Sequence, residues 1–236
     1  IISKILFITH SEEANPGNVK DALNDLGYET SVCCPMLGDN LPRLIAGKPE
    51  EFSATVIFGG PQLISQDSNI GYIKEEIEWI GEQVKCDSPL LGICLGAQMI
   101  SASLGYAVGP HPQGLREIGF HSVRPTPEGK EFFPSEALFY QWHREGFELP
   151  KDSRLLATGD IYQNQAFSLG SSVFGLQFHP EITVETINKW ITSVRGAPQL
   201  NRPEAQAADQ QRLLASKCVL EVKKWLPPFL KKWLHH

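Results

Sequence analysis

Hydrophobic and polar positions alternate between strand-like and helix-like patterns through the first half of the chain. Short segments bounded by turn residues predict strands of a buried sheet at residues 4–9, 28–33, 54–58 and 89–93. Apolar positions with helical spacing predict helices at residues 18–26, 70–84 and 95–104. This alternation predicts an α/β fold, a flavodoxin-like, mostly parallel open sheet with helices on both faces.

The second half of the chain changes to closely spaced strand signals. Candidate strands lie at residues 117–123, 137–140, 155–158, 165–169 and 173–178. We interpret them as a small antiparallel portion that returns to the main sheet with its last strand. A helix is then predicted over residues 183–194 and a loop over residues 196–203.

The C-terminal segment is amphipathic over residues 205–225 and is predicted to end at Pro227-Pro228. Its apolar face must be covered, either by folding back on the domain or by the same helix of a second subunit. We therefore divide the chain into a main domain, residues 1–196, and a C-terminal loop and helical extension, residues 197–236.

Charge and cysteine content argue against several functions. The formal net charge of −6 lacks the basic excess of a nucleic-acid-binding protein, and no apolar run reaches the ~20 residues that span a bilayer. We interpret the first residues as a strand rather than a signal peptide, because they contain Lys4 and lack a small-residue cleavage site. Five cysteines without metal-ligand or disulfide spacing are typical of a reducing cytoplasm, and we expect neither a metal nor an organic cofactor.

One cysteine lies in a context that activates thiols. Cys94 stands between Gly92 and Gly96, where a predicted strand passes directly into a helix. This is the pattern of a nucleophile elbow, a strained turn that lifts a reactive side chain to the edge of a parallel sheet. The free N–H groups of the following helix favour a thiolate, and the Leu95 N–H can donate to an oxyanion. The alternative, a packed core cysteine, fits the other four cysteines better because they lack this context.

A thiol nucleophile needs a nearby imidazole and a third group that orients it. His179 follows a predicted buried strand, so it should emerge at the same sheet edge as Cys94. Glu181 lies two residues later and faces the same side in an extended segment. His10 also follows a buried strand and is the alternative base, although a structural role is favoured for it.

A pair of glycines ends the third predicted strand. Gly59 and Gly60 allow the backbone to approach a substrate closely and to turn an N–H group into the site. If this strand neighbours the Cys94 strand, the Gly60 N–H is the second oxyanion donor.

Together these three motifs resemble the class I (triad) glutamine amidotransferases, over about residues 4–195. Within that family the chain looks most like the stand-alone proteins that resemble the amidotransferase domain of GMP synthase. The resemblance implies a triad of Cys94, His179 and Glu181, an oxyanion hole of Gly60 and Leu95, and substrate contacts by Gly59, Gln98 and His143. Residues 141–150 resemble the family's Ser-His-x-Asp segment, with Trp142 and Glu145 in the Ser and Asp positions.

The expected reaction is hydrolysis of the glutamine side-chain amide through a γ-glutamyl thioester. A γ-glutamyl peptidase acting through the same triad remains an alternative, and so does a non-catalytic binding module. The chain carries no phosphate-binding G-x-x-x-x-G-K motif and no second large domain for an acceptor. The expected partners are therefore glutamine or another γ-glutamyl small molecule, and an ammonia-accepting synthase subunit if one exists.

Overall fold

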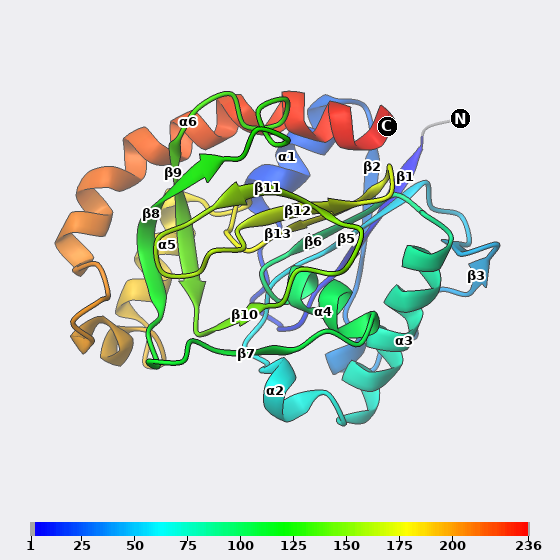
Figure 1. Ribbon diagram of the computed structural model, residues 1–236, viewed down its shortest axis with the longest axis horizontal. Coiled ribbons are helices and arrows are strands. Elements are labelled where there is room, and N and C mark those ends of the chain that lie inside the picture. The colour runs from blue at the N-terminus through cyan, green and yellow to red at the C-terminus, as the bar shows by residue number, and fades with distance from the viewer. Residues whose placement is uncertain (1–2, 236) are drawn as a thin grey trace.

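The computed structural model describes residues 3–235 of the chain. Within that range, nine strands form one mixed sheet in the order β2-β1-β5-β6-β13-β12-β11-β8-β9 (Figure 1). Helices lie on both of its faces. The predicted α/β fold with a parallel sheet and an antiparallel portion is confirmed.

Five strands form the parallel part of the sheet: β1 (Lys4–Ile8), β2 (Glu29–Cys33), β5 (Ala54–Ile57), β6 (Leu90–Ile93) and β13 (Val173–Leu176). The last three are buried at every position, as expected for strands covered by helices on both faces. β13 pairs in parallel with β6, and Leu176 lies opposite Ile93. The chain therefore returns from its antiparallel portion to the strand that precedes Cys94, as the sequence predicts.

The antiparallel part consists of β8 (Glu117–Pro125), β9 (Ala137–His143), β11 (Arg154–Thr158) and β12 (Ala166–Leu169). β9 is longer than predicted and carries Trp142 and His143 at its end. Two small two-stranded sheets were not predicted, because each strand is too short to show a period. They pair β3 (Leu44–Ile45) with β4 (Lys48–Pro49), and β7 (Val108–Pro110) with β10 (Glu145–Phe147).

Two hydrophobic clusters fix the helices on the two faces of the sheet. α1 (Gly17–Asp25) and α6 (Ala208–His235) share one cluster with inward-facing strand residues. α2 (Ile64–Asp67), α3 (Gly71–Lys85) and α4 (Leu95–Ser103) share the other (Figure 1). α5 (Val184–Thr192) is capped by the Thr183 side chain and packs against α6 in a third cluster. Short 3-10 turns occupy Pro35–Leu37 and Ala197–Asn201, the second where a loop was predicted.

The prediction that the C-terminal helix ends at Pro227-Pro228 is wrong. α6 continues to His235, although each proline removes a helix hydrogen bond. Aromatic packing on both sides of the prolines supplies the reason. Trp225 stacks on Phe229 across them with ring centroids 4.7 Å apart, and Trp233 is fully buried and donates from Nε1 to the Ser172 carbonyl at 3.0 Å.

The apolar face of α6 is thus covered within the same chain, which was one of the two predicted outcomes. The proposed boundary between residues 196 and 197 stays a prediction, although α6 contributes to the same core as β1, β5 and β6. No helix within residues 3–235 is long and apolar enough to cross a membrane.

Candidate active site

Cys94 stands at a strained turn between β6 and α4. Its backbone has φ +51° and ψ −105°, a conformation that non-glycine residues rarely adopt. The two glycines leave no room for side chains: a Cβ on Gly92 would lie 2.5 Å from the Gly96 carbonyl carbon, and one on Gly96 would lie 2.2 Å from the Ile57 oxygen. The local backbone therefore has the geometry that the nucleophile-elbow motif predicts.

His179 emerges just beyond β13, the strand that neighbours β6. Its Nδ1 lies 2.7 Å from Glu181 Oε1, and both side chains are buried. α1 holds the turn that carries them, since the Asn18 N–H donates to the Glu181 carbonyl at 2.9 Å. The imidazole also packs edge-on against Trp190 of α5, with ring centroids 5.3 Å apart.

The electrostatics of His179 favour the imidazolium. Burial by itself lowers its pKa, but the Glu181 carboxylate and then Cys94 act in the opposite direction, and the net pKa is raised well above 6.5. The buried Nε2 makes no hydrogen bond with any of the described residues. The Cys94 thiol is thus near enough to raise the pKa of the imidazole but lies outside hydrogen-bonding geometry.

Gly59 and Gly60 follow β5, which pairs with β6 as predicted. A Cβ on Gly59 would lie 2.9 Å from His179 Cε1 and 3.4 Å from Cys94 Cβ, so this glycine makes room for both side chains. A Cβ on Gly60 would lie 2.5 Å from His10 Cβ. Among the described residues, the Gly60 and Leu95 N–H groups have no hydrogen-bond acceptor, which leaves both available to an oxyanion.

Gln177 was not predicted as a site residue; it is fully buried and contacts Cys94. Its Nε2 lies 3.6 Å from Cys94 Sγ, and its Oε1 lies 3.3 Å from Gln98 Nε2. Gln98 Nε2 also donates to the Glu145 carbonyl at 2.9 Å, so its Oε1 is the atom left for a ligand. The signal for Gln177 was present, because it lies two residues before His179 and should face the same side.

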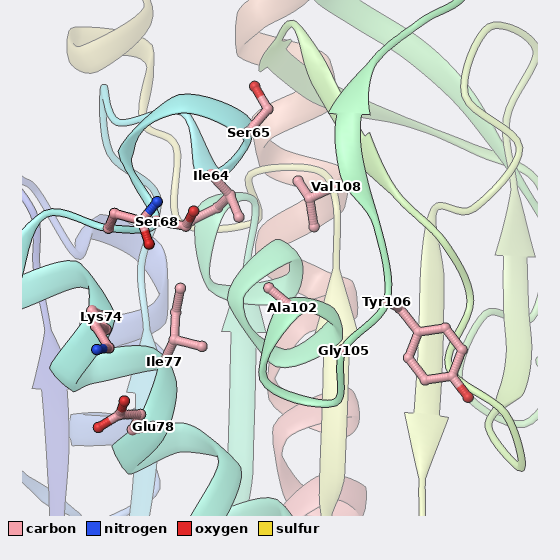
Figure 2. Close-up of a pocket in the computed structure, with 11 residues that line it drawn as sticks. Ile64, Ser65, Ser68, Lys74, Ile77, Glu78, Ala102, Gly105, Tyr106 and Val108 are labelled. Atoms are coloured by element: carbon pink, nitrogen blue, oxygen red, sulfur yellow. The ribbon is translucent and has the colours of Figure 1, made fainter.

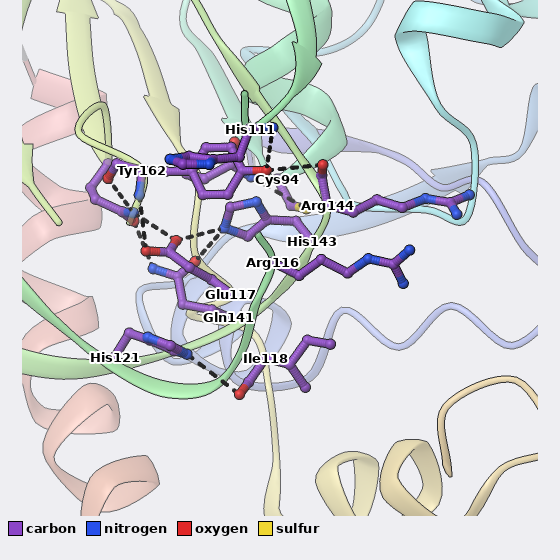
Figure 3. A network of polar contacts seen from close by, with 12 residues as sticks. Cys94, His111, Arg116, Glu117, Ile118, His121, Gln141, His143, Arg144 and Tyr162 are labelled. Atoms are coloured by element: carbon purple, nitrogen blue, oxygen red, sulfur yellow. Dashed lines mark hydrogen bonds and ion pairs between the residues drawn. The ribbon is translucent and has the colours of Figure 1, made fainter. Parts of the chain in front are cut away.

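His143 lines the same site, but its ring nitrogens are engaged inside the protein. Nδ1 lies 2.8 Å from the Glu145 carbonyl and Nε2 lies 2.8 Å from Glu117 Oε2 (Figure 3). Burial raises the pKa of Glu117, but its hydrogen bond with His143 and the charge of His143 outweigh burial and lower that pKa overall. This geometry lets His143 position Glu145 rather than donate to a substrate itself.

His10, the alternative base, is fully buried and tied to another carboxylate. Its Nε2 lies 2.9 Å from Glu76 Oε1 on α3, and its Nδ1 lies 3.4 Å from the Gly59 carbonyl. The ring therefore packs against the Gly59-Gly60 turn and supports its conformation.

A cleft of about 970 Å³ opens over Cys94 and reaches Trp142, Trp190 and the chain beyond α5. All eight predicted site residues line it: Gly59, Gly60, Cys94, Leu95, Gln98, His143, His179 and Glu181. A smaller hollow of about 460 Å³ lies between α2, α3 and α4 and contains none of them (Figure 2). Among residues 3–235, no cluster of three or more histidine, cysteine or acidic side chains is arranged to hold a metal ion.

Residues 12–193 match the family model of the class-I glutamine amidotransferases, and the chain belongs to this family. The resemblance inferred from the three motifs is therefore confirmed.

Similar proteins extend the comparison to nearly the full chain. A glutamine amidotransferase-like protein of Salmonella typhimurium is 28% identical over 94% of this chain and 90% of its own length. The crystal structure of a glutamine amidotransferase from Thermotoga maritima superposes with a TM-score of 0.86 at 28% identity and covers all of both chains. A GMP synthase of Legionella pneumophila is 28% identical over 63% of this chain but only 30% of its own length. Gamma-glutamyl peptidase 5 of Arabidopsis thaliana is 29% identical over 58% of this chain and 56% of its own.

Proposed function

We propose that the protein hydrolyses the side-chain amide of glutamine, with Cys94 as the nucleophile and His179 as its acid–base partner. The observation that carries this proposal is the buried 2.7 Å contact between His179 and Glu181, beside a cysteine held at φ +51°. A buried glutamate on one ring nitrogen leaves the other nitrogen for the nucleophile.

The first step forms a thioester. The Cys94 thiolate, with the imidazolium as its counter-ion, attacks the amide carbonyl, and the C–N bond breaks as His179 gives its proton to the departing ammonia. The Gly60 and Leu95 N–H groups stabilise the oxyanion of the tetrahedral intermediate. Neutral His179 then takes a proton from water, whose oxygen attacks the thioester and releases glutamate and the Cys94 thiolate.

A γ-glutamyl peptidase is the second candidate, and the size of the cleft favours it. A volume of about 970 Å³ lies at the upper end of the usual range for small-molecule pockets, about 300–1,000 Å³. A γ-glutamyl dipeptide would use this space better than free glutamine does. The similarity to the plant γ-glutamyl peptidase is compatible with this candidate.

The non-catalytic alternative has less support, because a binding module needs neither the strained Cys94 backbone nor the aligned His179. As an amidotransferase, the chain would pass ammonia to a synthase partner in the reducing cytoplasm. The similarity to GMP synthase makes such a partner plausible, but the alignment covers only the amidotransferase portion of that enzyme.

The decisive experiment is a substrate screen that measures glutamate release from glutamine, γ-glutamyl dipeptides and the corresponding α-linked dipeptides. We expect release from γ-linked compounds only, with Cys94→Ala as the inactive control. Hydrolysis of no γ-glutamyl compound, or undiminished hydrolysis by Cys94→Ala, would refute the proposed function.

A further inference from the structure

Two arginines follow the end of the β8–β9 pair, where a sheet would normally place opposite charges. β8 and β9 pair in antiparallel register, with Glu117 opposite His143. The next residue beyond each of these is an arginine, Arg116 on one chain segment and Arg144 on the other. Like charges directly opposite each other destabilise a strand pair, so this arrangement has a cost in the free protein.

The backbone around both residues is held firmly. The Tyr162 hydroxyl lies 2.9 Å from the Arg144 carbonyl and 3.1 Å from the Leu115 carbonyl, which ties the two segments together. Behind them lies the buried Glu117–His143 ion pair. Figure 3 shows both arginine side chains extended in the same direction, away from that pair.

Neither guanidinium has a carboxylate of its own. Arg144 is exposed, and its guanidinium makes no hydrogen bond or ion pair within residues 3–235. The Arg116 guanidinium bonds only to the neutral Gln199 Oε1, at 3.2 Å. Nearby Glu204 instead pairs with Arg202 at 2.7 Å. Partial burial and then the charges of Arg202 and Arg144 lower the pKa of Arg116, and the Glu204 carboxylate offsets this only in part.

The position of the pair connects it to catalysis. Arg144 and Gln199 both line the cleft that contains Cys94, and Glu145 follows Arg144 directly and turns inward beside Gln98. Arg144 therefore adds to the wall of the cleft a guanidinium group without a carboxylate partner, and such a group suits an anion.

We propose that Arg116 and Arg144 form a subsite that binds a carboxylate of the γ-glutamyl substrate. This inference rests on the proposed function. Two carboxylates of such a substrate have the required chemistry: the α-carboxylate of the glutamyl unit and a carboxylate on the leaving amine. A carboxylate bound in the subsite would relieve the repulsion between the two arginines. That relief would contribute to the free energy of substrate binding.

The test measures kcat/KM for γ-glutamylglycine and for two neutralised analogues, one amidated at the α-carboxylate and one at the glycine carboxylate. For Arg144→Gln we expect a loss of about 10- to 100-fold on substrates that keep the recognised carboxylate, and little loss on the analogue that lacks it. Arg144→Lys should recover part of the loss because it keeps the charge. Arg212→Gln, on the surface of α6 outside the cleft, is the matched control.

The analogue that escapes the loss identifies which carboxylate is bound. Equal losses on all three compounds, or no loss on any of them, would overturn the inference. Calorimetric titration of γ-glutamylglycine into Cys94→Ala, with and without Arg144→Gln, separates this inference from the proposed function. Arg144-dependent binding together with an inactive wild-type protein would refute the hydrolytic function alone, whereas binding that is independent of Arg144 would refute the subsite.

Discussion

Replacing Gly59 by alanine inserts one methyl group between the nucleophile and its base. That Cβ would lie 2.9 Å from His179 Cε1, about 0.5 Å short of the 3.4 Å at which ordinary contact begins. The imidazole lies between Glu181 and Trp190 and must move or tilt by about this amount. Misplacing a catalytic group by 1 Å can reduce the rate about 10²-fold, so we expect kcat to fall about 10-fold or more.

The assay is glutamate release under saturating substrate, with thermal unfolding measured on the same samples. Gly71→Ala is the matched control, because no atom lies within 4 Å of a Cβ built on Gly71. We expect this control to keep wild-type activity and Gly59→Ala to remain folded. Undiminished kcat in folded Gly59→Ala would mean that His179 does not act from the position described, and the assignment of the base would be lost.

Four further predictions test the site and its support. A glutamine-like diazo-ketone should alkylate Cys94 selectively, as mapped by peptide mass, even though Cys86 is the exposed thiol; dominant labelling of Cys86 would contradict the assignment. His179→Ala should lose nearly all turnover, and Glu181→Gln should lose about 10²-fold or more in kcat. Because Glu181 helps raise the pKa of His179, its stabilising effect is fully present below pH ~6.5 and is lost as pH rises through the raised pKa. Denaturant unfolding of Glu181→Gln and wild type should therefore differ most near pH 6 and less once the pH exceeds the raised pKa of His179, and a difference that stays equal across that titration would refute the linkage. Trp233→Ala should cost about 3–5 kcal/mol of unfolding free energy, measured in urea, because it empties a fully buried site; a change below 1 kcal/mol would show that α6 contributes little.

The parts of the site that depend on local backbone chemistry could be predicted from the sequence. The turn at Cys94 requires Gly92 and Gly96 on geometric grounds alone, because a Cβ at either position would collide with the neighbouring backbone. The convergence of Cys94 and His179 follows from the rule that parallel strands end at a common edge. These inferences needed only the type of element on each side of a residue.

Features that depend on distant partners could not be predicted. His143 was interpreted from its motif, but its ring nitrogens are fixed by Glu117, which lies on another strand 26 residues earlier. In the same way, Pro227 and Pro228 stop an isolated helix, yet Trp225 and Trp233 pack into the core on either side of them. Helix propensity indicates that prolines disfavour the interior of a helix. The burial of aromatic side chains that offsets this effect is visible only in the folded chain.

Glu145 shows how a single departure from the family motif changes the inner end of the cleft. Its carboxylate contacts the Ser65 hydroxyl on α2, while its carbonyl accepts hydrogen bonds from Gln98 and His143. An aspartate in this position would be one methylene shorter and could not make the same contact with Ser65 without a backbone shift. The longer side chain thus ties α2 to β10 and holds the carbonyl that orients Gln98. Since Gln98 in turn contacts Gln177, which lies against Cys94, the substitution reaches the proposed nucleophile through the side chains of Gln98 and Gln177 rather than by touching it.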